Sequence, residues 1–160
     1  MIEAMEDVEW SNWMPLAKAA QQAPKLPGVY QARVTGTTDV VYVGMAGERS
    51  RNGKVPAKGL RARIKGYESG RVLTNGLGRA VVTNALRDPS FRSLVAATEI
   101  DDVVAFGKLA FEHAKIEIRW AETADKKSAV ELENLLLAQL DNLWNRKSIP
   151  AKKIVKLEGS

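Results

Sequence analysis

The sequence of 160 residues contains no cysteine and a single histidine, His113. The lack of cysteine excludes disulfide bonds and thiolate zinc sites, and one histidine cannot build a zinc–histidine cluster. No apolar run approaches the roughly 18 residues that a membrane-spanning helix needs. Residues 1–7 are acidic, whereas a signal peptide begins with basic residues. We therefore expect a cytoplasmic protein without a membrane partner, in which His113 is structural.

Aromatic residues are also few, at 6% of the chain, and acidic residues are unevenly placed. The net charge is only +5, but from Arg49 to Arg79 the sequence has nine lysines or arginines against one acid, Glu68. Such a basic block is typical of a surface that binds phosphate backbones, and a solvated basic loop is the alternative. We predict that the following basic side chains bind nucleic acid: Arg49, Arg51, Lys54, Lys58, Arg61 and Lys65.

Two short apolar segments contain the tripeptides Gly28-Val29-Tyr30 and Tyr42-Val43-Gly44. Between them, residues 36–39 read Gly-Thr-Thr-Asp, which favours a turn. The pattern predicts a β-hairpin with strands over about 28–35 and 39–45. Taken alone, the two tyrosines would be residues of the core or of cross-strand packing.

The rest of the chain predicts helices and one further clear strand, over 115–121, where polar and apolar residues alternate. Helices are predicted from Ser11 to about Gln22, over about 57–67, over 76–113 with a break at Asp88-Pro89, and from Asp125 to about Trp144. A short strand is also predicted near 154–157.

Three strands surrounded by helices indicate a single α+β domain over residues 1–160. Within this domain we expect a helical N-terminal arm over 1–24, a helical insertion over 68–113 and a basic C-terminal tail over 146–160.

Glu133 lies in the long helix that is predicted to begin at Asp125. At about 100° per residue, Glu133 falls near the middle of the apolar arc of this helix, whereas Glu131 falls on the polar side. A carboxylate that faces the core is costly unless it meets a cation, binds a metal or is protonated. Glu133 is therefore either a metal ligand or part of a buried ion pair with an arginine.

Two further pairs follow the hairpin: Arg63 with Tyr67 four residues later, and Glu133 with Asn145 twelve residues later. Together with the two tripeptides, this ordered set resembles the GIY-YIG nuclease family. The resemblance implies a small three-stranded antiparallel sheet flanked by helices. It also implies a Mg²⁺-dependent (or Mn²⁺-dependent) endonuclease that hydrolyses phosphodiester bonds, with DNA favoured over RNA.

The insertion over 68–113 is longer than a minimal module of that family needs. We expect it to serve either substrate selection or dimerisation, so that a homodimer is one of the expected assemblies.

The resemblance implies a catalytic set of six residues: Tyr30, Tyr42, Arg63, Tyr67, Glu133 and Asn145. Within this set, Glu133 would hold the metal ion, because Mg²⁺ binds through few carboxylates and keeps several waters. The guanidinium of Arg63 would bind the non-bridging oxygens of the phosphate.

The resemblance gives the tyrosines roles around the attacking water, with Tyr30 as the general base and Tyr42 as the group that positions the water. Tyr67 would share the helix face of Arg63, and Asn145 would bridge the end of the long helix to the tyrosines. A phenol with a pKa near 10 is a poor base unless nearby cations lower that pKa.

Met45 departs from the family pattern, because many members have lysine immediately after the second tripeptide. Lys54 or Lys58 could supply the missing charge, or the activity is weaker. Two alternatives therefore stay open. One is an inactive nucleic-acid-binding or protein-interaction module on the same scaffold, and the other is the nuclease domain of a toxin or restriction system.

Overall fold

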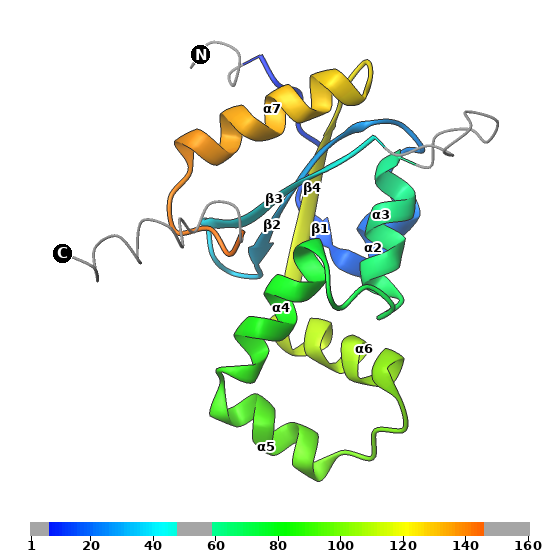
Figure 1. The fold of residues 1–160 in the computed structure, drawn as a ribbon, viewed down its shortest axis with the longest axis vertical. Helices are drawn as coiled ribbons and strands as arrows, with labels where there is room; N and C mark the ends of the chain where they lie inside the picture. Colours follow the sequence, from blue (N-terminus) through cyan, green and yellow to red (C-terminus); the bar gives the residue numbers. More distant parts are fainter. Residues whose placement is uncertain (1–6, 48–58, 146–160) are drawn as a thin grey trace.

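The computed structural model of the chain describes residues 7–47 and 59–145. These residues form an α+β fold with a four-stranded antiparallel sheet and six helices (Figure 1). The strand order is β1-β4-β2-β3. The strands are β1 (Met14–Pro15), β2 (Gly28–Val34), β3 (Val40–Ala46) and β4 (Ile116–Glu122).

The predicted hairpin is confirmed, since β2 and β3 pair antiparallel with Tyr30 opposite Gly44 and Ala32 opposite Tyr42. Directly paired residues of a sheet project from the same face. Both tyrosines therefore leave the sheet on one side, from neighbouring strands. Their rings stack with centroids 6.1 Å apart.

The glycines of the two tripeptides lie where a side chain has no room. A Cβ at Gly44 would overlap the ring carbon and the hydroxyl of Tyr30. A Cβ at Gly28 would lie 2.7 Å from Cδ1 of Leu60 and would overlap the carbonyl oxygen of Ala121. The ring of Tyr30 lies across β3 at Gly44, where only glycine leaves room for it. Packing therefore requires the glycine of the second tripeptide.

The fourth strand, β1, corrects the prediction of three strands and of a helix that begins at Ser11. Ser11 is extended beside β4, where its backbone N–H donates to the carbonyl of Trp120 at 2.8 Å and its hydroxyl accepts the N–H of Trp120 at 3.0 Å. Met14 then pairs with Ile118, and helix α2 (Leu16–Gln22) begins only after Pro15. Proline fits here because an edge position does not need its N–H.

The other helices of the described residues are α3 (Gly59–Glu68), α4 (Gly76–Leu86), α5 (Pro89–Ala97), α6 (Val103–Ala114) and α7 (Lys126–Gln139). Three begin at an aspartate whose carboxylate accepts a backbone N–H of the first turn: Asp88 for α5, Asp102 for α6 and Asp125 for α7. These caps confirm the break at Asp88-Pro89 and the predicted start at Asp125.

Helix α7 ends at Gln139 instead of Trp144, because Leu140 has an extended backbone with ψ of 140° and Asn142 has a positive φ of 59°. The chain then turns back to the free edge of β3, where the N–H of Trp144 donates to the carbonyl of Val41. Backbone groups at a sheet edge need partners, and this segment provides them.

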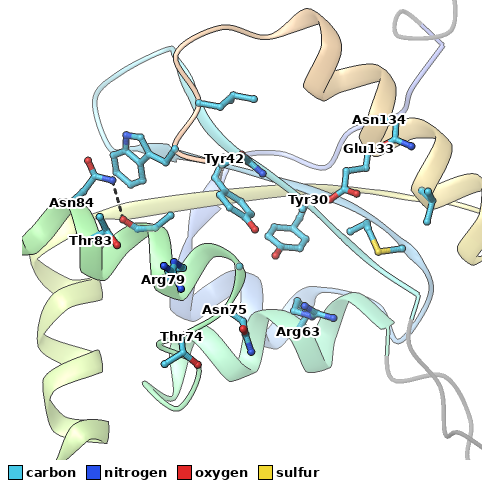
Figure 2. A pocket seen from close by; sticks show the side chains of 18 of the residues that line it. Tyr30, Tyr42, Arg63, Thr74, Asn75, Arg79, Thr83, Asn84, Glu133 and Asn134 are labelled. Atoms are coloured by element: carbon cyan, nitrogen blue, oxygen red, sulfur yellow. Dashed lines mark hydrogen bonds between the residues drawn. The ribbon is translucent and has the colours of Figure 1, made fainter. Parts of the chain in front are cut away.

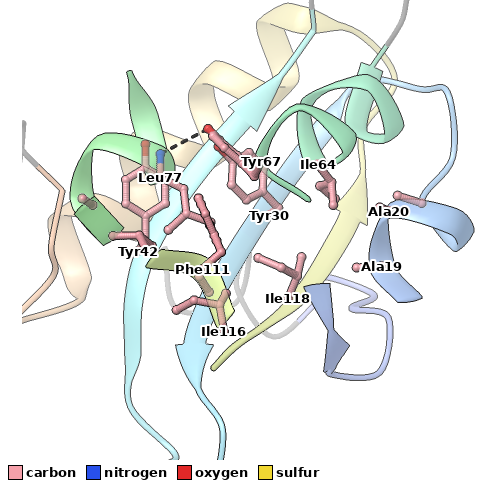
Figure 3. Close-up of a cluster of buried hydrophobic side chains, with 14 of the residues drawn as sticks. Ala19, Ala20, Tyr30, Tyr42, Ile64, Tyr67, Leu77, Phe111, Ile116 and Ile118 are labelled. Atoms are coloured by element: carbon pink, nitrogen blue, oxygen red, sulfur yellow. Dashed lines mark hydrogen bonds between the residues drawn. The ribbon is translucent and has the colours of Figure 1, made fainter. Parts of the chain in front are cut away.

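Helices cover both faces of the sheet. One face packs against α2, α3, α4 and α6 around Tyr30, Tyr67 and Phe111 (Figure 3). The other face packs Val29 and Val43 against α7. Helix α5 packs mainly against the insertion helices α4 and α6 and lies far from the sheet (Figure 1).

None of the helices in the ranges 7–47 and 59–145 has the length and apolar character needed to cross a membrane. The predicted strand near 154–157 and the basic tail over 146–160 lie outside the described residues.

Candidate active site

A cleft of about 980 Å³ opens where β2 and β3 meet α3, α4 and α7 (Figure 2). The charged side chains that line it are three arginines and one carboxylate: Arg63, Arg79, Arg87 and Glu133. Tyr30, Tyr42 and Asn145 also line the cleft. The described lining is therefore net positive, which favours an anionic ligand.

Tyr30 lies deepest, with 1% of its surface exposed. Its hydroxyl forms a 2.7 Å hydrogen bond with the hydroxyl of Tyr67, and the oxygen of Tyr67 also accepts the backbone N–H of Leu77 at 3.2 Å. Tyr67 itself is fully buried and packs its ring against Phe111. The hydroxyl of Tyr67 thus links the Tyr30 hydroxyl to the first turn of α4 and holds it in place (Figure 3).

Tyr42 is buried beside Tyr30, and its hydroxyl lies near the start of α4, since a Cβ at Gly76 would be 3.3 Å from it. Burial is the main cause that raises the pKa of both Tyr30 and Tyr42 well above the ordinary value. Tyr67 raises both pKa values further, and Glu133 adds to the effect at Tyr42. Both phenols are therefore protonated at neutral pH in the chain itself.

Arg63, on α3, projects toward the two tyrosines (Figure 2). Its charge acts to lower the pKa of both Tyr30 and Tyr42, but this effect is smaller than that of burial. The expectation that cations lower the tyrosine pKa values therefore holds in direction for Arg63, and burial outweighs it. A guanidinium at this position is suited to bind the oxygens of a phosphate.

Glu133 lies on α7 and has 8% of its surface exposed, whereas Glu131 is exposed on the same helix. Its charge affects the pKa of Tyr42, so the carboxylate lies close to that phenol although α7 packs mainly on the opposite face of the sheet. The carboxylate is thus buried on the apolar side of α7, as helical periodicity predicts, and it lines the cleft.

The donor set of the cleft suits Mg²⁺ rather than zinc. Within the residues that the structure describes, no three carboxylate or imidazole side chains gather into a metal site. Glu133 would then be the only carboxylate ligand from the described cleft lining, and Mg²⁺ is a cation that accepts one or two carboxylates together with waters. The fit rests on this oxygen ligand and on the open, polar space beside it.

Asn145, for which the resemblance implies a bridge to the tyrosines, binds the backbone of β3. Its Oδ1 accepts the N–H of Val43 at 2.9 Å and its Nδ2 donates to the carbonyl of Val43 at 2.6 Å. The amide thereby pairs with the edge of β3 as another strand would. Val43 separates Tyr42 from Gly44, so Asn145 positions the strand that carries Tyr42.

The predicted nucleic-acid-binding residues fall into two groups. Four of them, Arg49, Arg51, Lys54 and Lys58, lie outside the described residues. Of the other two, Arg61 donates from Nε to the carbonyl of Ala23 at 2.6 Å and so links α3 to the end of α2. Lys65 is exposed, and neither Arg61 nor Lys65 lines the cleft.

Sequence reasoning missed the side of the cleft that α4 forms. Asn75, Arg79, Thr83 and Arg87 all line it. These four polar residues recur at every fourth position, which is a signal that the sequence contains. Met45, at the position where the family commonly has lysine, borders the cleft and packs with the apolar residues under α7.

His113 lies in the last turn of α6 and is structural, as expected. Its Nε2 pairs with Oδ2 of Asp88 at 2.8 Å, and its ring packs on Phe91 with centroids 5.0 Å apart. The pair joins α6 to the turn between α4 and α5. Together with the helix caps, it holds the insertion in one arrangement.

A comparison of the chain with protein-family models gives no match, and neither curated proteins nor solved structures give a significant one.

Proposed function

We propose that this chain is a Mg²⁺-dependent endonuclease of the GIY-YIG type that hydrolyses phosphodiester bonds, with DNA as the favoured substrate. The observation that carries the proposal is a convergence. Tyr30 of β2, Tyr42 of β3, Arg63 of α3 and Glu133 of α7 are far apart in the sequence and line one cleft. Packing alone does not require an arginine and a buried carboxylate to meet two tyrosines there.

In this proposal Arg63 binds the non-bridging oxygens of the scissile phosphate and stabilises the negative charge that develops on them. Tyr42 orients the attacking water, and Tyr30 accepts its proton. Tyr67 holds the Tyr30 hydroxyl in place through their 2.7 Å hydrogen bond. The raised pKa of Tyr30 means that the base is scarce at neutral pH and becomes more abundant as the pH rises.

Glu133 would hold the divalent cation. When bound, such a cation supplies positive charge that stabilises the leaving oxygen and favours the ionised phenol.

The rival function is a nucleic-acid-binding module that lacks activity, and Met45 is the observation that favours it. A lysine at that position would add positive charge beside the cleft, and Met45 instead packs with the apolar residues under α7.

A plasmid assay separates the two functions. Incubation of supercoiled DNA with the protein and Mg²⁺ should give nicked or linear product, and EDTA should abolish it. Binding to the same DNA without any cleavage in Mg²⁺ or Mn²⁺ would favour the rival.

A further inference from the structure

Helix α4 presents two opposite stripes. Leu77, Val81 and Ala85 recur at every fourth position and are buried. Residues two positions earlier or later lie about 200° around the helix, which places the second stripe on the other side. That stripe, which we call the α4 polar stripe, consists of Asn75, Arg79, Thr83 and Arg87.

The α4 polar stripe faces the cleft along its whole length, since all four residues line it. Figure 2 shows Asn75 and Arg79 on the side of the cleft that lies across from Glu133. The stripe also begins next to the tyrosines, because Leu77 of the same helix donates its N–H to Tyr67. A ligand at Arg63 and Tyr42 that extends along the cleft would therefore run past the stripe.

In the described part of the chain, no ion pair neutralises the charge of the stripe. Arg79 and Arg87 are both exposed, and within the ranges 7–47 and 59–145 neither forms an ion pair with an acidic side chain. The described cleft lining has one carboxylate, Glu133, and it belongs to the opposite helix. In the stripe, the amide of Asn75 precedes the two arginines and the hydroxyl of Thr83 lies between them. Arginine, asparagine and threonine side chains commonly bind phosphate oxygens.

The spacing also suits a nucleic acid. Arg79 and Arg87 are eight positions apart, which is about 12 Å along a helix that rises 1.5 Å per residue. One strand of a duplex advances about 3.4 Å per nucleotide, so the two guanidinium groups can meet phosphates about three to four nucleotides apart. We infer that the α4 polar stripe binds the phosphate backbone of the substrate next to the bond that is cut.

This inference rests on the proposed function for the identity of the ligand. It assigns phosphate binding to the helical insertion, beyond the six basic side chains that the sequence analysis predicts to bind nucleic acid. An acidic protein segment could also meet two arginines. A cleft that continues into the tyrosine site, with hydroxyl and amide groups beside the arginines, favours a phosphate backbone.

The test measures equilibrium binding of a fluorescently labelled DNA duplex in EDTA, so that no cleavage is needed. Arg79→Gln and Arg87→Gln should each weaken binding and lower the slope of log K against log salt by about 0.9 for each phosphate that the variant no longer neutralises. Together the two changes should lower the slope by about twice as much. Lys108→Gln, an exposed change on α6 away from the cleft, is the matched control and should behave as the wild type does.

Wild-type affinity and salt slope in the Arg79→Gln, Arg87→Gln double variant would overturn the inference, and so would an equal loss in Lys108→Gln. Wild-type DNA binding by the double variant would indicate that the stripe binds a protein partner instead of DNA. The nuclease proposal fails separately, through the absence of Mg²⁺-dependent cleavage by the wild type. Far-ultraviolet circular dichroism shows that each variant is folded.

Discussion

The ring of Tyr30 lies across the backbone of Gly44 on the neighbouring strand, so closely that a Cβ at Gly44 would overlap it and would lie 2.8 Å from Cε1. The two tripeptides therefore form one packing unit, in which a glycine on β3 makes room for the tyrosine of β2. The position of the Tyr30 hydroxyl in the cleft depends on this contact.

Gly44→Ala should lower the free energy of unfolding by about 1–3 kcal/mol, the usual cost of overpacking a core. Urea unfolding measures it. In a Tyr30→Leu background the same change should cost much less, because the ring is gone and the two residues no longer interact. An equal cost in both backgrounds would show that Gly44 serves the backbone and not the tyrosine.

Arg63→Ala should reduce single-turnover cleavage by at least about 100-fold, the scale for losing a donor to the transition state. The neighbouring Arg61 is a matched control on the same helix, since it bonds the carbonyl of Ala23 instead of lining the cleft. Arg61→Ala should cost about 1–3 kcal/mol of stability and leave the rate of the folded enzyme nearly unchanged. If the two variants lose the same rate when the same fraction of each is folded, Arg63 has no special role in cleavage.

The two buried phenols predict a loss of stability in alkali. Folding raises the pKa of Tyr30 and Tyr42 above the ordinary value near 10. Their contribution to stability is therefore complete below about pH 10 and is lost as the pH rises toward the folded-state pKa. Thermal unfolding from pH 8 to 11 should show a steeper fall for the wild type than for Tyr30→Phe or Tyr42→Phe. Parallel curves would contradict the burial of ionisable hydroxyls.

The same phenols predict how cleavage depends on pH. Because Tyr30 is protonated at neutral pH, the single-turnover rate should rise steadily between pH 6 and 9 without a plateau, and Tyr30→Phe should be nearly inactive. A flat profile together with an active Tyr30→Phe would remove this tyrosine from the mechanism.

Asn145 should protect the backbone amide of Val43, in the middle of β3, from hydrogen exchange. Asn145→Asp keeps an acceptor for the N–H of Val43 but removes the donor to its carbonyl, and we expect a stability loss of about 1–3 kcal/mol. Hydrogen exchange at the Val43 amide should become faster. Asn134→Ala, an exposed change in α7, should leave that amide protected. Unchanged exchange in Asn145→Asp would contradict the strand-like role of the amide.

Local chemistry made much of the fold predictable. The hairpin follows from two β-branched runs around a turn, and the starts of α5, α6 and α7 follow from aspartates that bond backbone N–H groups. Glu133 was predictable as a buried carboxylate because helical periodicity alone places it toward the core.

The remainder depends on contacts between distant segments. Strand β1 is only two residues long and pairs with Ile118 and Glu117 of β4, more than 100 positions away, which no local pattern predicts. The early end of α7 depends on the free edge of β3, to which Asn145 returns. The role of Arg79 and Arg87 depends on α4 packing across the cleft from α7, and periodicity cannot supply that arrangement.

The most direct test compares Glu133→Gln with Glu131→Gln in Mg²⁺-dependent cleavage of plasmid DNA, with DNA binding and thermal stability measured in parallel. Both residues lie on α7, but Glu133 lines the cleft and Glu131 is exposed. We predict that Glu133→Gln folds, binds DNA as the wild type does and does not cut it, whereas Glu131→Gln cuts normally. A Glu133→Gln protein that still cuts DNA in Mg²⁺, or one that loses about 3–5 kcal/mol of stability as a broken buried ion pair would, contradicts the assignment of Glu133 as the metal ligand.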